Sequence, residues 1–337
     1  MKLFLKYQLL FMLLVAGLSG YSQDIHFSQF YQSPFSLNPA LVGDFDGAYR
    51  LIGNQRSQWR SVTVPYTTWG FSGDANKILN SNYSAGVSLF TDKAGDSQLK
   101  TTMLNLVFGR SFTPTNKEKD QLNVGAMFGL TFMSIDYSAL RYDNQWNGFS
   151  YDPSINAGEQ YTRDSRSYLN LNIGASYSYF IDDTRSLKGG VALFNLSNPK
   201  QSFFDQAFVR LDPRVVVHGN YLQKLNDQWQ IEPMLLFMSQ AKFIEFNIGG
   251  RGYYVLDNRS WNYEALYFGF LGRTRDAGNI IAGMKYHQWD VGLSYDVNLS
   301  SLKPASSGRG GFEIGVIYII PHSPTIGDVK KICPDYI

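Results

Sequence analysis

The chain has 337 residues, a formal net charge of +2, and 15% aromatic but only 17% charged residues. Soluble globular proteins usually carry about 25% charged residues, so this composition disfavours a soluble fold. No basic stripe is present, which gives no support to nucleic-acid binding. The single cysteine, Cys333, excludes an intramolecular disulfide. A mean hydropathy of -0.21 is too polar for a helical membrane protein and suits a barrel, because half of each barrel strand faces water.

Residues 1–22 are predicted to be an export signal peptide. Lys2 and Lys6 supply positive charge, residues 9–18 form a short apolar core, and Gly20-Tyr21-Ser22 offers a small-x-small cleavage site. Cleavage after Ser22 would leave Gln23 as the first mature residue. A retained membrane helix would need roughly 20 apolar residues, more than this segment has.

Between residues 47 and 320, apolar and polar residues alternate over many separate runs. In the run 168–180, Leu169, Leu171 and Ile173 fall on one face, and Asn170 and Asn172 fall on the other. Successive side chains of a strand point to opposite faces, so one face meets an apolar medium and the other a polar one. This pattern, repeated behind a signal peptide, predicts an all-β fold: an antiparallel transmembrane β-barrel of outer-membrane type over residues 47–320.

The alternation predicts about 14 strands, an even number, as single-chain bacterial barrels normally have. Between Leu122 and Phe132, Met127 is the one apolar exception on the polar face. A soluble β-sandwich or lipocalin-like barrel is disfavoured, because its strands are typically only about 5–6 residues long. The predicted strands cover 47–55, 66–75, 83–91, 98–111, 120–136, 168–181, 187–195, 209–224, 229–239, 243–254, 262–272, 278–287, 289–298 and 310–320.

The connections between these strands agree with a periplasmic start of the barrel. Connections after even-numbered strands should return to the periplasm, where turns are short, and all of them are short. Connections after odd-numbered strands should lie outside the cell and include the three longest: 137–167, 196–208 and 299–309. Only the tight turn near Ser239-Gln240 is unexpectedly small for an outside loop.

No catalytic, cofactor-binding or metal-binding residue is predicted. A nucleophile with its base needs several groups that converge at one place, whereas His26, His218, His287 and His322 are scattered along the chain. No metal-ligand spacing occurs either. We therefore do not expect an enzyme, and we interpret His218 as a polar residue that faces the lumen.

Six charged residues share the polar face of their strands and should point into the lumen, because a charge that faces lipid costs several kcal/mol near the midplane. One interpretation is a selectivity lining, or a docking surface for a plug or a partner. The other is that paired charges simply solvate a polar interior. The residues are Glu245, Arg251, Lys285, Asp290, Asp296 and Glu313.

The long outside loops are the predicted surface for a secreted partner. Asp143, Asp152 and Glu159 could bind calcium, but their spacing fits no known cation loop, so a solvated surface loop is the better interpretation of 137–167. Exposed aromatic residues are enriched at protein interfaces. The candidate contacts in 137–167 and 196–208 are Trp146, Tyr151, Tyr161, Phe203 and Phe204.

Two segments lie outside the strand pattern. Residues 23–46 are too apolar to float free in the periplasm and should pack in the lumen or against the periplasmic rim. The tail 321–337 should extend into the periplasm, either to dock a partner or as a loosely packed end. Cys333 is either a buried thiol or a partner in an intermolecular disulfide. The candidate contacts for periplasmic partners are Phe27, Phe30, Tyr31, Cys333 and Tyr336.

Both ends of the chain carry motifs of one known family. The stretch Asp24-Ile25-His26-Phe27-Ser28-Gln29-Phe30, followed by Asn38-Pro39-Ala40-Leu41-Val42-Gly43, resembles the mature N-terminus of the PorP/SprF family of Bacteroidetes outer-membrane proteins. It departs from the family at Ile25-His26, where Pro is common. Ser294-Tyr295-Asp296-Val297-Asn298, Gly310-Gly311, Glu313-Ile314 and the terminal Cys333-Pro334 resemble the family's other motifs.

This resemblance implies a component of the type IX secretion and gliding-motility apparatus. It implies support for the secretion and surface retention of large adhesins, or of other cargo with a type B C-terminal domain. Periplasmic lipoproteins of the apparatus and membrane lipid are the other implied partners, and no cofactor is implied. A passive outer-membrane porin or small-molecule transporter remains the alternative.

Overall fold

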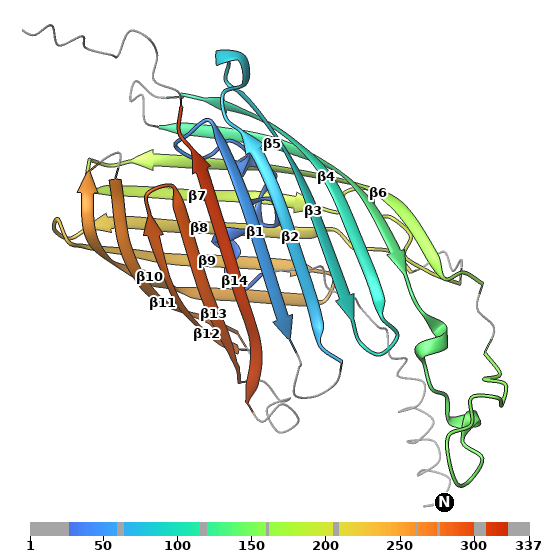
Figure 1. Ribbon diagram of the computed structural model, residues 1–337. Coiled ribbons are helices and arrows are strands. Elements are labelled where there is room, and N and C mark those ends of the chain that lie inside the picture. Colours follow the sequence, from blue (N-terminus) through green and yellow to red (C-terminus); the bar gives the residue numbers. More distant parts are fainter. Residues whose placement is uncertain are drawn as a thin grey trace, which may run out of the picture.

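A closed antiparallel barrel accounts for most of the chain. The computed structural model describes residues 27–58, 64–114, 120–159, 162–204, 209–259, 262–274, 277–299 and 308–322. Each strand pairs with its neighbours in sequence, and β1 pairs with β14 to close the barrel (Figure 1). The predicted antiparallel barrel of 14 strands is confirmed. The predicted signal peptide, Tyr161, Cys333 and Tyr336 lie outside the described residues.

The strands match the ranges expected from the alternation, with small shifts at their ends. They are β1 Tyr49–Gln58, β2 Tyr66–Ala75, β3 Tyr83–Ala94, β4 Leu99–Phe112, β5 Gln121–Ser134, β6 Ser165–Phe180, β7 Arg185–Phe194, β8 Arg214–Lys224, β9 Trp229–Gln240, β10 Phe243–Arg259, β11 Asn262–Arg273, β12 Ala277–Tyr286, β13 Trp289–Asn298 and β14 Arg309–Ile320.

Two strand ends differ clearly from the prediction. β10 continues to Arg259 through a register shift between Val255 and Asp257, beyond the predicted end at residue 254. β8 begins at Arg214, not at 209, because the residues before it form an isolated bridge between Lys200 and Arg210. The alternation of apolar and polar residues shows which side chains face lipid and which face the lumen. Backbone pairing between strands can extend beyond the alternating residues or stop before they end.

The two faces of each strand meet different surroundings. Along β4, Leu104, Leu106 and Phe108 are exposed on the outside, while Asn105 and Val107 are buried inside. The same division extends across the neighbouring strands, because Leu104 pairs with Leu89 on one side and Leu130 on the other. The result is an apolar outer band of the kind that faces lipid.

The connections define two rims that differ in length. The turns 76–82, 181–184, 225–228 and 287–288 all lie at one end of the barrel, here called the short-turn rim. The three longest connections, from β5 to β6, from β7 to β8 and from β13 to β14, follow odd-numbered strands, so they begin and end at the other end of the barrel, the long-loop rim. β1 begins at the short-turn rim, as the predicted alternation of short and long connections requires.

Aromatic side chains mark the short-turn end of the apolar band. The guanidinium of Arg110 lies 5.0 Å from the ring centre of Tyr83 and 4.8 Å from that of Phe112. Such aromatic girdles lie at membrane–water interfaces, where a ring can be half in lipid and half in water. Two further ring pairs at this rim are Trp229 with Tyr254 and Trp289 with Tyr318.

The first described residues lie inside the barrel. Three short helices, η1 Phe30–Gln32, α2 Pro34–Leu37 and η2 Pro39–Leu41, fold within the ring of strands (Figure 1). Pro34 and Pro39 each sit at the start of a helix, where a missing N–H costs nothing, and the Asn38 side chain accepts from the Ala40 N–H. In the described part of the chain, no helix is long and apolar enough to cross a membrane.

The outward apolar band predicts a position-dependent cost for charge. Phe268 lies in the middle of β11 and is exposed outward, whereas the exposed Ile244 lies beside the β9–β10 turn. We expect Phe268→Arg to destabilise the barrel by about 2–4 kcal/mol in a bilayer, and Ile244→Arg by about 0–1 kcal/mol. Urea unfolding in lipid vesicles measures both. Equal costs at the two positions would contradict a lipid-facing band.

Candidate functional site

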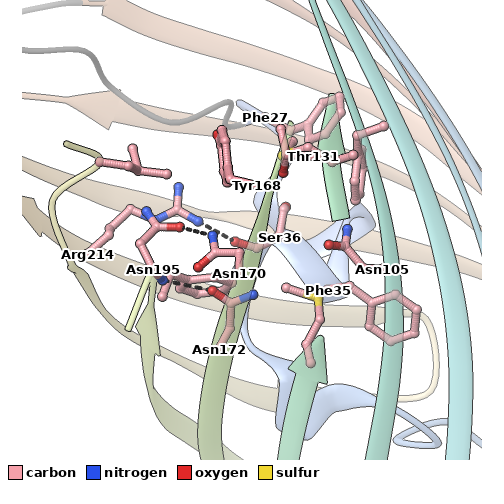
Figure 2. Close-up of a pocket in the computed structure, with 15 residues that line it drawn as sticks. Phe27, Phe35, Ser36, Asn105, Thr131, Tyr168, Asn170, Asn172, Asn195 and Arg214 are labelled. Atoms are coloured by element: carbon pink, nitrogen blue, oxygen red, sulfur yellow. Dashed lines mark hydrogen bonds between the residues drawn. The ribbon is translucent and has the colours of Figure 1, made fainter. Parts of the chain in front are cut away.

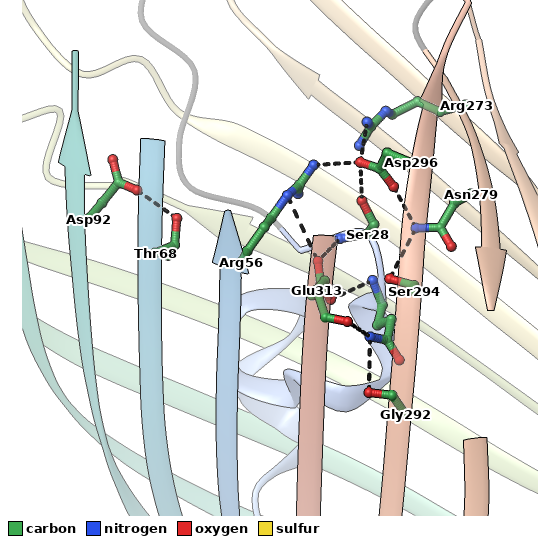
Figure 3. Close-up of polar contacts among 11 residues, drawn as sticks. Ser28, Arg56, Thr68, Asp92, Arg273, Asn279, Gly292, Ser294, Asp296 and Glu313 are labelled. Atoms are coloured by element: carbon green, nitrogen blue, oxygen red, sulfur yellow. Dashed lines mark hydrogen bonds and ion pairs between the residues drawn. The ribbon is translucent and has the colours of Figure 1, made fainter. Parts of the chain in front are cut away.

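Residues 27–46, here called the plug, are held at their first end by a cluster of buried charges (Figure 3). The carboxylate of Glu313 accepts from the backbone N–H groups of Ser28, at 2.8 Å, and Gln29, at 2.9 Å. The carboxylate of Asp296 accepts from the Ser28 hydroxyl at 2.8 Å. Arg56 bridges the two carboxylates, at 3.0 Å from Asp296 and 3.8 Å from Glu313. We call this cluster the latch.

The latch is nearly sealed from solvent and balanced in charge. Glu313 is only 2% exposed and Asp296 only 4%. Arg273 lies 3.2 Å from Asp296, and Asn279 donates to the same carboxylate at 2.7 Å. Among the described residues, two guanidinium groups thus oppose two carboxylates. A buried charge is tolerated only when it is paired and hydrogen-bonded, so removing one member is strongly destabilising.

The middle of the plug is held by amide side chains that reach the wall. Gln32 Nε2 donates to the Tyr267 hydroxyl at 3.0 Å and to Asp290 Oδ1 at 3.2 Å. Asn38 Nδ2 lies 3.0 Å from the Ala175 carbonyl oxygen and 3.1 Å from His218 Nε2. His218 therefore faces the lumen and meets the plug.

Glycines in the wall make room for these two amides. A Cβ at Gly315 would collide with Gln32 Oε1, and a Cβ at Gly174 would collide with Asn38 Oδ1. Glycine in a strand marks close approach of another group to the backbone. The wall is thus shaped to receive the plug.

The far end of the plug is pinned beside the short-turn rim. Asp74 accepts from Arg50 Nη2 at 2.7 Å and from the Gly43 N–H at 2.8 Å. Asp44 forms an ion pair with Lys188. Asp74 lies next to the end of β2 at this rim, whereas Glu313 lies in the half of β14 nearer the long-loop rim. The plug therefore runs along the lumen between two charged anchors.

Apolar contacts fill the space between these anchors. Phe27, 3% exposed, packs on Phe90 with 6.0 Å between the ring centres, and Phe35 is buried in the main apolar cluster. Phe30 is also buried there, at 7% exposed. The barrel wall covers both rings, and the contact of Phe27 and Phe30 with a periplasmic partner stays a prediction.

Tyr31 and the lumen charges form a second cluster. The Arg251 guanidinium lies 3.7 Å from the Tyr31 ring centre, and Arg251 Nη2 lies 2.6 Å from Glu232 Oε2. Lys285 lies 3.6 Å from Asp290. Tyr31 thus also faces the wall of the lumen. Of the predicted lumen charges, Arg251, Lys285, Asp290, Asp296 and Glu313 gather around the plug.

Glu245 stands apart from that group. It lies in the third position of β10, near the β9–β10 turn, and its Oε1 accepts from Asn247 Nδ2 at 2.7 Å. It is only partly buried. The structure therefore does not bring Glu245 to the plug.

Space remains on both sides of the plug. Toward the long-loop rim lies a cavity of about 560 Å³, counting its open mouth, with Phe35, Met127 and Phe194 among its apolar lining and Asn170 and Asn172 among its polar lining (Figure 2). Toward the short-turn rim lies a charged cavity of about 810 Å³, counted in the same way. Its lining includes Tyr31, Arg50, Lys188, His218, Arg251 and Lys285. The plug stands between the two cavities.

The loop 135–164 presents aromatic rings to solvent. Trp146 is 58% exposed and forms an isolated bridge with Tyr151, whose ring lies 4.9 Å from the Arg141 guanidinium. Phe149, between them, is 92% exposed, although the sequence interpretation did not single it out. In the neighbouring loop, Phe204 is 48% exposed and Phe203 is partly buried.

Short local hydrogen bonds shape this loop. The Ser138 hydroxyl and N–H donate to Asp136, and the Ser154 hydroxyl and N–H donate to Asp152. These bonds lower the pKa of each aspartate below its usual range, since they favour the charged form. Both carboxylates are thus engaged in turns. In the described residues, no group of three or more His, Cys, Asp or Glu side chains is placed to hold a metal ion.

The fold and the filled lumen define a plugged outer-membrane β-barrel. A family model described as type IX secretion system membrane protein PorP/SprF matches residues 19–318. The chain therefore belongs to the PorP/SprF family of type IX secretion system membrane proteins.

Other comparisons add only distant likenesses. No curated protein matches the chain. Among solved structures, the CymD monoaromatic hydrocarbon channel is 12% identical with a TM-score of 0.48, covering 90% of this chain and 95% of that one. The toluene transporter TodX of P. putida is 12% identical with a TM-score of 0.48 over 85% and 93%. The KdgM porin is 9% identical with a TM-score of 0.36 over 79% and 98%.

The latch predicts that one substitution loosens the plug. We expect Arg56→Ala to weaken plug docking by about 3–5 kcal/mol, because Asp296 and Glu313 would stay buried without the guanidinium that bridges them. Labelling of the buried plug position Ser33, as Ser33→Cys in a Cys333→Ser background, by a membrane-impermeant thiol reagent measures the exposure.

The matched control is Lys285→Ala, which removes one member of a partly exposed pair and should change labelling little. Equal labelling of the Arg56→Ala variant and the parent protein would refute the latch.

Proposed function

We propose that this barrel serves type IX export as a protein-docking component and not as a conduit for solutes. The plug is the observation that carries the proposal. It is anchored at one end by Glu313 and Asp296 and at the other by Asp74, and its rings fill the space between. Because the plug occupies the lumen, partner binding at the two rims is favoured over passage of solutes through the barrel.

In this proposal, the long-loop rim faces the cell exterior and engages secreted cargo. Longer loops of single-chain bacterial barrels lie on that side. The cargo would be a large adhesin of the gliding apparatus, or another protein with a type B C-terminal domain, and the barrel would support its secretion and surface retention. The exposed rings of Trp146, Phe149 and Phe204 support this role, since aromatic anchors supply much of the energy of protein interfaces.

The short-turn rim would face the periplasm and its lipoproteins. β14 ends at this rim, and the chain continues from there beyond residue 322. Cys333 and Tyr336 remain candidate contacts on that tail, and Tyr161 remains a candidate in the outer loop. The exported location of the chain also depends on the proposed signal peptide, residues 1–22.

Cargo docking can be tested with side chains that do not support the barrel. We expect the triple variant Trp146→Ser, Phe149→Ser, Phe204→Ser to reduce co-purification and surface display of secreted cargo at least about tenfold, because a few aromatic anchors dominate most interfaces. The control is Leu79→Ser, which removes an exposed apolar but non-aromatic side chain at the opposite rim. Unchanged cargo display by the folded triple variant would contradict cargo docking at the long loops.

The alternative function, a passive porin or small-molecule transporter, requires an open lumen. We expect the purified protein to show no steady conductance in planar bilayers, and a variant lacking residues 27–46 to conduct, because the plug occupies the lumen. The Lys285→Ala variant is the matched control and should stay closed. Steady conductance of the unaltered protein would favour the pore.

A further inference from the structure

The outer surface carries two lysines that face one another at the long-loop end of the apolar band. Lys93 on β3 and Lys100 on β4 are register partners, and both are exposed. They lie on the outward face, because Leu89 and Leu104, further along the same face, are also register partners. The two ammonium groups therefore stand side by side on the membrane side of the barrel.

This pairing is unfavourable unless something neutralises it. Like charges directly opposite one another on neighbouring strands destabilise a sheet. Within the described part of the chain, neither Lys93 nor Lys100 forms an ion pair. An anion held between them would turn the repulsion into two attractions.

The height of this pair matches the edge of a bilayer. Lys100 and Arg110 lie on the same face of β4, ten residues apart. At ~3.3 Å per residue and a strand tilt of ~40°, this spacing is ~25 Å along the membrane normal, the height of the apolar band of such barrels. Arg110 is held between Tyr83 and Phe112 at the short-turn interface. Lys93 and Lys100 therefore lie at the opposite interface, level with lipid headgroups.

A polar groove continues from Lys100 along the same face. Lys100 is the register partner of Ser134, which is in turn the partner of Ser165. The groove occupies about 950 Å³, counting open space, and its lining also includes Thr102, Ser167 and Arg163. Asp164 Oδ1 accepts from the Ser165 hydroxyl at 3.0 Å. Arg166 also lines the groove, so with Lys93 the described residues bring four basic side chains to the site, beside the carboxylate of Asp164.

We propose that Lys93, Lys100 and the groove beside them bind the phosphorylated headgroup of an outer-leaflet lipid. Lysine ammonium groups and hydroxyls are suitable donors to phosphate oxygens. Phe132 also lines the groove, and it is exposed together with Leu104 and Leu169 further along the same outward face, which offers a surface for acyl chains. The site depends on the long-loop rim facing outward but not on cargo docking.

The test uses the full protein in nonionic detergent and bisphosphorylated lipid A as the probe. Native mass spectrometry measures the bound fraction for the parent protein, the double variant Lys93→Gln, Lys100→Gln, and the control Lys242→Gln, which lies at the same rim in the β9–β10 turn. We expect the double variant to bind at least about tenfold more weakly, and the control to match the parent, since each basic residue near a membrane surface attracts anionic lipid.

A second readout separates a lipid site from a loss of fold. Without lipid, the double variant should be at least as heat-stable as the parent, because the lysine repulsion is gone. Lipid A should then raise the unfolding temperature of the parent more than that of the variant. Equal binding by parent and double variant would overturn the proposal. So would equal stabilisation of the parent by phosphatidylcholine, or by inorganic phosphate at the same concentration. Cargo display is measured separately and decides the docking role on its own.

Discussion

Closure of the barrel between β1 and β14 is the constraint on which the rest of the structure depends. In lipid, every backbone group must find a partner, so an open sheet edge is not tolerated. At this seam, Arg56 and Glu313 are direct register partners, and they are also two members of the latch. Glu313 in turn accepts from the backbone of Ser28 and Gln29. The charge pair that spans the seam therefore also holds the plug, which couples closure of the barrel to filling of its lumen.

The sequence predicted the strands well because a strand in lipid has only two kinds of surroundings. Each alternating run corresponds to a strand in the structure. The errors lie at strand ends such as residues 209–213, where an isolated bridge between Lys200 and Arg210 precedes the start of β8. Met127, the exception on the polar face of β5, is explained by the plug: it is buried in the main apolar cluster with Phe35. The inner wall is thus partly apolar because it faces another part of the chain and not only water.

Contacts between the plug and the wall could not be predicted in the same way. Ser28 meets Asp296 across 268 residues of sequence, and Asn38 meets His218 across 180. The plug lacks alternation, so nothing in it specifies which strand each residue approaches. The aromatic side chains of the plug predicted burial, and the charged residues of the strands predicted an interior face. Only the closed barrel brings the plug and these charged residues together. Phe149 was missed for a related reason, since exposure in a loop leaves no periodic signal.

In the proposed account, the outer band contacts lipid, the long loops would engage cargo, and the short-turn rim would engage periplasmic partners. The proposed docking roles require a lumen that is filled in the membrane-bound protein. Hydrogen–deuterium exchange of the unaltered protein in lipid nanodiscs tests this requirement most directly. The account predicts that amides of residues 27–46 exchange as slowly as those of β13 and β14. Exchange of residues 27–46 as fast as that of the loop 135–164 would contradict it.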